Sequence, residues 1–264
     1  MMNIPHRIGL IVPSSNVTTE TELPELMARH RSAAGPGFTF HSSRAVLHRV
    51  DAESLRRMVG ESDRCARELA DARVDVVAYA CLIAIMAEGK GAHEASEARL
   101  AATLVAAGCT APVTSSAGAL VRSLRRLDAK RVALVAPYMR SLTQVVIDYL
   151  AAYGIEVVSS VSLEVDDNVA VGRLDPRGLA AHAARLDMLR ADAVVLSACV
   201  QMPSLPAIND AEQEFDLPVL SASTATAHEV LALLGEAPCV PRAGAALAPL
   251  GSLSAPRLWR SSPV

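Results

Sequence analysis

Short apolar runs alternate with amphipathic segments along almost the whole chain. The apolar runs that predict strands are 7–12, 37–42, 74–80, 111–114, 131–136, 155–161, 192–198 and 217–220. The segments whose pattern predicts helices are 18–30, 52–71, 92–107, 116–127, 140–152, 176–190, 204–215 and 223–234. Strands that alternate with helices of this length are typical of an α/β protein with doubly wound parallel sheets.

The two halves of the chain repeat the same order of motifs. In both, a basic residue opens a strand, a later strand ends in Cys, and a Pro-Val strand ends in Ser. The matching segments are 7–13 with 131–137, 74–81 with 192–199, and 111–115 with 217–221. We therefore expect two similar lobes related by pseudo-two-fold symmetry, with the active site in the cleft between them.

The repeat also predicts where the lobes begin and end. The first lobe should comprise residues 1–115 together with 221–248, and the second lobe residues 116–220. Residues 249–264 break the alternating pattern and are rich in Pro, Ala, Gly and Ser. We expect this tail to be poorly ordered.

Composition narrows the class of protein. Half of the 264 residues are hydrophobic, which is enough for a sizeable core, and the net charge of −3 without a basic block argues against nucleic-acid binding. Charged residues interrupt every apolar run before the roughly 20 residues that a spanning helix needs. The start of the chain lacks the pattern of a signal peptide, so we expect a cytoplasmic protein without a membrane partner.

The cysteines point to catalysis rather than to structure. Their number is odd, no CxxC pair occurs, and the seven His do not lie at metal-ligand spacing from them. This pattern argues against a disulfide framework and against a metal site.

Cys81 and Cys199 are the main catalytic candidates, because each ends a buried strand run of the repeat. Open α/β sheets bind ligands at the carboxyl ends of their strands. A helix predicted to start after Cys81 should lower the pKa of its thiol from about 8.5 toward 7 or below. A lone cysteine here would more often be a small buried hydrophobe, but its duplication favours a functional pair.

Polar residues near the other strand ends have two open interpretations. Ser14 and Asn16 follow the first strand, where they could cap a helix or help to cradle a carboxylate. Tyr138 occupies the position that matches Ser14 in the second repeat, and could equally be an ordinary half-buried tyrosine. Asn168 lies in a segment whose Asn and Asp-Pro also favour a turn.

Together these motifs resemble a known family. Two parallel lobes with a strand-end Cys in each are similar to the aspartate/glutamate racemase superfamily. The motif contexts resemble the maleate isomerase family within it, over about residues 7–247. The segments that carry this resemblance are 11–16, 79–86, 136–138, 168–172 and 197–203.

The resemblance implies a reaction without a cofactor or metal. Cys81 would add to the double bond of maleate, Cys199 would assist proton movement, and fumarate would form after rotation about the resulting single bond. The residues expected to bind this small dicarboxylate are Asn16, Tyr138, Asn168, Ser14, Leu82 and Val200. We also expect a homo-oligomer.

Three other functions stay open at this point. A two-cysteine racemase of the aspartate/glutamate or hydantoin type would use the same thiols as opposed bases. A decarboxylase of the superfamily would need one of the two cysteines. A two-lobed binding protein would need neither thiol.

Overall fold

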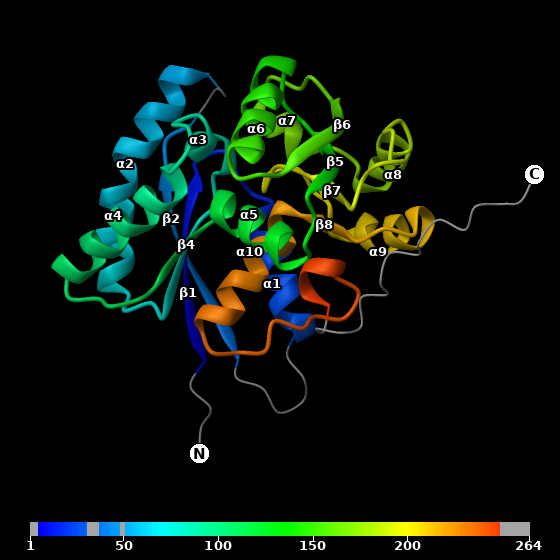
Figure 1. Ribbon diagram of the computed structural model, residues 1–264. Coiled ribbons are helices and arrows are strands. Elements are labelled where there is room, and N and C mark those ends of the chain that lie inside the picture. The colour runs from blue at the N-terminus through cyan, green and yellow to red at the C-terminus, as the bar shows by residue number, and fades with distance from the viewer. Residues whose placement is uncertain (1–4, 31–36, 48–50, 249–264) are drawn as a thin grey trace, which may run out of the picture.

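Two four-stranded sheets lie side by side in the computed structural model, which describes residues 5–30, 37–47 and 51–248 (Figure 1). The strand order of the first sheet is β2-β1-β3-β4, and all its neighbouring strands are parallel. Its strands are β1 (His6–Pro13), β2 (Phe38–Ala45), β3 (Val76–Tyr79) and β4 (Val113–Ser115).

The second sheet repeats this plan with the order β6-β5-β7-β8, again with parallel neighbours. Its strands are β5 (Arg131–Ala136), β6 (Glu156–Ser162), β7 (Ala193–Ser197) and β8 (Val219–Ser221). The identical order confirms the α/β fold with two similar parallel sheets that the sequence repeat predicts.

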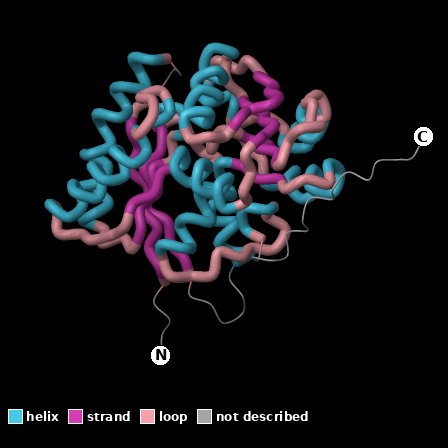
Figure 2. The backbone as a smooth tube through the Cα atoms, in the orientation of Figure 1, coloured by secondary structure: helices cyan, strands magenta, loops and turns pink. Residues whose placement is uncertain are grey.

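Helices surround both sheets (Figure 2). In the first half these are α1 (Thr19–His30), α2 (Ala52–Asp71), α3 (Leu82–Met86), α4 (Ala92–Ala106) and α5 (Ser116–Arg126). In the second half they are α6 (Arg140–Ala152), α7 (Asn168–Val171), η1 (Pro176–Gly178), α8 (Leu179–Ala183), α9 (Leu205–Phe215), α10 (Ala222–Leu233) and η2 (Ala245–Leu247). Because helices pack on the faces of the sheets, every residue of the central strands β3 and β7 is buried.

The helices that follow the last strand of each sheet meet at the centre of the molecule. α5 and α10 pack against each other, and α10 also contacts α1, β3 and β4 (Figure 1). Ser115 and Ser221 are the N-caps of these helices, and the hydroxyl of each accepts a backbone N–H of the first turn. The exact lobe limits at residues 115 and 220 stay a prediction.

The helix predicted over 176–190 is wrong in its second half. After α8 ends at Ala183, the chain forms turns rather than further helix. The Asp187 carboxylate accepts the N–H of Leu189, and the Asp187 N–H donates to the Ser159 hydroxyl on β6. These local bonds replace helical ones although the apolar spacing continues. The predicted tail, 249–264, lies outside the described residues.

Candidate active site

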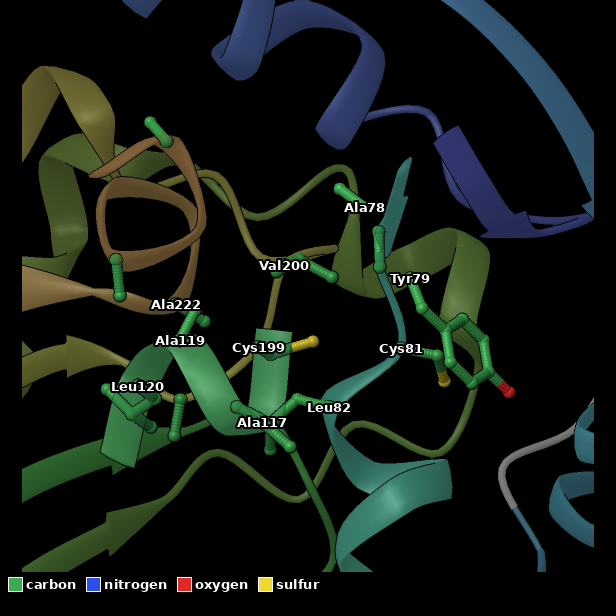
Figure 3. Packing of buried hydrophobic residues seen from close by; sticks show 14 of the residues in the cluster. Ala78, Tyr79, Cys81, Leu82, Ala117, Ala119, Leu120, Cys199, Val200 and Ala222 are labelled. Carbon is green, nitrogen blue, oxygen red and sulfur yellow. The ribbon is translucent and has the colours of Figure 1, made fainter. Parts of the chain in front are cut away.

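The two repeated cysteines meet at one cavity between the sheets. Cys81 follows β3 by two residues and Cys199 follows β7 by two residues, which places both at the carboxyl ends of central strands. Their side chains are buried, and Figure 3 shows them close together with Leu82 and Val200. The described residues lining this cavity are Pro13, Asn16, Leu47, Ala80, Cys81, Leu82, Ile83, Tyr138, Asn168, Cys199, Val200 and Gln201.

The cavity contains very little free space. Its volume of about 20 Å³ is close to that needed by one water molecule. The walls must therefore move apart before an organic ligand can enter.

Cys81 stands at the N-cap of the short helix α3. Burial raises the pKa of its thiol to about 12, the N–H of Ala84 opposes this rise, and the neighbouring Cys199 adds to it. The expectation of a lowered pKa is therefore wrong for the closed cavity. One turn of helix supplies too little favourable dipole to offset the loss of solvent.

The sulfur of Cys199 is surrounded by more hydrogen-bond donors than the sulfur of Cys81. Burial also raises the pKa of this thiol, but the Tyr138 hydroxyl and the N–H groups of Gln201 and Met202 act in the opposite direction. The backbone nitrogen of Gln201 lies 3.4 Å from the Cys199 Sγ. These groups would stabilise negative charge on this sulfur.

Tyr138 lies just beyond β5 and is buried in the cavity wall. Its hydroxyl is hydrogen-bonded to Cys199, and burial raises its own pKa well above the ordinary value. The hydroxyl is therefore a neutral donor at physiological pH. It can turn toward either the thiol or a ligand oxygen.

Asn16 is fully buried in the loop between β1 and α1. Its Oδ1 accepts the N–H of Thr19 at 3.0 Å, so the side chain also supports the start of α1. Its Nδ2 has no hydrogen-bond partner within the described chain, although the residue lines the cavity. A buried amide without a partner costs free energy, and an acceptor in the cavity would recover that cost.

Asn168 brings the second half of the chain to the same loop. It is the first residue of α7, which Asp167 caps, and its Nδ2 donates to the Ser15 Oγ at 2.7 Å. The predicted turn is thus a short helix. Asn16 and Asn168 approach the cavity from opposite sheets.

Ser14 does not belong to the described cavity lining. Its hydroxyl accepts the N–H of Leu47 at 3.0 Å and therefore fixes the end of β2. Sequence reasoning missed Gln201, although it lies inside the motif around Cys199. Its signal was a polar residue that follows a buried strand end, and the structure gives it partners in both halves.

Across residues 5–30, 37–47 and 51–248, His, Cys, Asp and Glu form no group of three or more that could hold a metal ion. In the same ranges no helix combines the length and the apolar character that a bilayer crossing requires.

Comparison with known proteins agrees with this geometry. The family model described as arylmalonate decarboxylase matches residues 8–247. A maleate isomerase of Geobacillus stearothermophilus is 55% identical over 91% of this chain and 96% of its own length. One of Alcaligenes faecalis is 52% identical over 90% of this chain and 95% of its own length.

Two groups of solved structures resemble this chain, the maleate isomerases and arylmalonate decarboxylase. The maleate isomerase Iso of Pseudomonas putida S16 matches with a TM-score of 0.91 and 48% identity, covering 92% of this chain and 98% of that one. Arylmalonate decarboxylase matches at 22% identity with a TM-score of 0.71, which shows a shared fold. With two strand-end thiols in one cavity and relatives at this level of identity, the chain belongs to the maleate isomerase family, within the group that the decarboxylase model describes.

Proposed function

We propose that this enzyme converts maleate to fumarate without a cofactor, by reversible addition of the Cys81 thiol to the double bond. The named relatives support the substrate, since they are maleate isomerases. A cysteine-to-serine variant of the Nocardia farcinica enzyme holds a covalently bound succinylcysteine intermediate. This match, at 49% identity, covers 98% of that chain and 92% of this one with a TM-score of 0.88.

The reaction follows from the chemistry of the double bond. The Cys81 sulfur forms a bond to C2 of maleate, and the π electron pair moves to C3 and its carboxylate. Rotation about the C2–C3 single bond then becomes possible. Loss of the C3 proton, which Cys199 supplies during addition, and departure of the Cys81 sulfur restore the double bond in the trans form, so the net reaction consumes no proton, electron or co-substrate.

Cys199 would balance the protons in this sequence. Burial raises the pKa of both thiols, so each carries its proton in the closed cavity. As Cys81 attacks, Cys199 can deliver its proton to C3 and take up the proton of Cys81. The product of this step is a succinyl thioether on Cys81, and its reversal after rotation regenerates both thiols.

The unpaired Nδ2 of Asn16 is the observation that carries this proposal. A buried amide donor in a cavity with two thiols calls for an anionic or carbonyl oxygen as its partner. Asn168 and Tyr138 would bind the substrate from the other half of the chain. Such neutral donors can stabilise the charge that moves onto the far carboxylate during addition.

The alternatives fit the cavity less well. A racemase needs a partner for an ammonium or ring group, and the described lining contains no Asp, Glu, Lys or Arg. A decarboxylase needs one thiol, whereas two line this cavity. A binding protein needs none.

Proton NMR with maleate and no cofactor tests the activity. We expect conversion to fumarate, while an arylmalonate should release no CO₂ and aspartate should not exchange its α-proton in D₂O. Decarboxylation or α-proton exchange without isomerisation would replace the proposal by the matching alternative. If alkylation of both thiols leaves maleate conversion intact, the covalent route is wrong.

Asn16→Asp tests the binding role separately from the capping role. The new carboxylate keeps an acceptor for the Thr19 N–H but replaces the free donor by a negative charge. We expect the KM for maleate to rise by roughly 100-fold, because like charges in a dry site repel by several kcal/mol. Asn209→Asp makes the same chemical change outside the cavity lining and should leave KM unchanged. Equal KM values for both variants would remove Asn16 from the site.

The remaining proposals concern the oligomeric state of the protein, its ligand and its location in the cell. We propose a homo-oligomer with a small dicarboxylate as its partner, located in the cytoplasm. Light scattering of the purified protein checks the first, and a molar mass equal to one chain would contradict it.

A further inference from the structure

Gln201 lies between the two halves of the chain with its side-chain amide fully engaged. Its side chain is 2% exposed. The Oε1 accepts the N–H of Val17 at 3.0 Å and that of Thr18 at 3.4 Å. The Nε2 donates to the carbonyl of Ser15 at 3.1 Å and to that of Asn168 at 2.8 Å.

A primary amide has two N–H donors and two lone pairs, and this one uses all four. Its orientation is therefore fixed, because a flipped amide would face N–H against N–H and oxygen against oxygen. The partners at Ser15 and Val17 are the immediate neighbours of Asn16. The fourth bond reaches the backbone of Asn168 itself.

We propose that Gln201 is the positioning residue that sets the spacing between Asn16 and Asn168, and hence the fit of the cavity to a dicarboxylate. This inference rests on the proposed function for its substrate. The same residue donates its backbone N–H to the Cys199 sulfur, and its backbone carbonyl accepts the Thr18 hydroxyl at 2.7 Å. One residue thus connects a thiol with both amide donors.

Gly172 supplies a second, independent observation. Its φ of −68° is open to any residue, so the backbone does not require glycine there. A Cβ at this position would lie 2.6 Å from the Gln201 Nε2 and 3.1 Å from its Cδ. Because four hydrogen bonds hold that amide in place, a methyl group at Gly172 must displace it.

The test is a double-mutant cycle. Gln201→Ala and Gly172→Ala should each raise the KM for maleate by roughly 10-fold or more with a smaller effect on kcat, since they disturb donors that bind the substrate carboxylates throughout the reaction. The double variant should be no worse than Gln201→Ala alone, because alanine at 201 leaves room for the new methyl group. Gly178→Ala, whose Cβ meets open space at a φ of −74°, is the matched control.

Gln201→Glu separates positioning from space filling. It keeps the volume and both acceptor bonds but turns an oxygen toward the carbonyls of Ser15 and Asn168. We expect a KM at least as high as that of Gln201→Ala. A near-native KM for Gln201→Glu, or additive effects in the cycle, would overturn the inference while leaving the isomerase function intact.

A readout without maleate covers failure of the proposed function. Loss of the Gln201 bonds should loosen the segment after β7 that carries both Gln201 and Cys199. Iodoacetamide should therefore label Cys199 faster in both single variants, and the double variant should react no faster than Gln201→Ala. If the wild type does not isomerise maleate, the labelling rates of the four proteins alone test the positioning role of Gln201. Native labelling rates in Gln201→Ala would then overturn the inference.

Discussion

The surroundings of Cys81 and Cys199 differ although their backbones are related by the repeat. Both follow a central parallel strand by two residues, and both are buried. Burial raises the pKa of Cys81 to about 12, with the Ala84 N–H acting against it. Burial raises the pKa of Cys199 as well, but a tyrosine hydroxyl and two backbone N–H groups oppose that rise.

In the proposed mechanism, this difference would allow the two copies of one motif to serve two tasks. A thiol with few donors keeps a reactive electron pair once its proton leaves, which suits a nucleophile. A thiol with several donors can hold negative charge between proton transfers, which suits an acid–base group. The charge of the buried Glu22 carboxyl also acts to raise the pKa of the Cys199 thiol.

Removal of the nucleophile should have the largest effect. Cys81→Ala should lower kcat for maleate by roughly 10⁴-fold or more, because the covalent route is lost. Cys109→Ala removes a buried thiol that does not line the cavity and should keep native kinetics. More than a tenth of wild-type kcat in Cys81→Ala would contradict the assignment.

Removal of the acid–base thiol should cost less. Cys199→Ala should reduce kcat by roughly 10²- to 10⁴-fold, the usual contribution of one positioned acid–base group. Steady-state kinetics across pH provides the measurement. An unchanged kcat and an unchanged pH profile would show that Cys199 has no acid–base role in the reaction.

Tyr138→Phe should have an effect between those of the two cysteine variants and of a residue outside the cavity. Loss of its hydroxyl removes a donor to Cys199, so the pKa of that thiol should rise further. We expect kcat to fall by roughly 10- to 100-fold. Alkylation of Cys199 should also need a higher pH than in the wild type. Tyr153→Phe, outside the cavity lining, is the control, and equal profiles for the two variants would contradict this role.

The last effect concerns stability at high pH rather than the rate of catalysis. The pKa of Cys81 is raised in the folded protein from 9.0 to about 12, so the protonated thiol contributes stability that is complete below pH 9 and is lost as pH rises toward 12. Between these limits the unfolding free energy should fall by about 1.4 kcal/mol per pH unit from this group. Urea unfolding of the wild type and Cys81→Ala checks it, and parallel pH curves would be the contrary result.

Much of this site could be predicted from the sequence. The buried strand runs and their repeat placed Cys81 and Cys199 at matching strand ends, and the structure brings them to one cavity with Asn16, Tyr138 and Asn168. Local pattern is informative here because strand ends of a parallel sheet share one edge.

What the sequence did not reveal depends on contacts distant along the chain. The raised pKa of Cys81 comes from burial by both halves, which outweighs the helix start visible in the sequence. The side-chain amide of Gln201 bonds to residues 33 to 186 positions away, so its place after a buried strand end marks a polar residue near the site but does not reveal these partners. The overlong helix at 176–190 fails because the Asp187 N–H bonds to Ser159 on another element.

Mapping of the covalent adduct tests the division of labour most directly. Cys199→Ser should be mixed with maleate, quenched with acid and digested, and the peptides analysed by mass spectrometry beside Cys81→Ser treated in the same way. The account predicts a succinyl group on Cys81 in the first variant and none on Cys199 in the second. A succinyl group on Cys199 in Cys81→Ser, together with an unmodified Cys81 in Cys199→Ser, would contradict it.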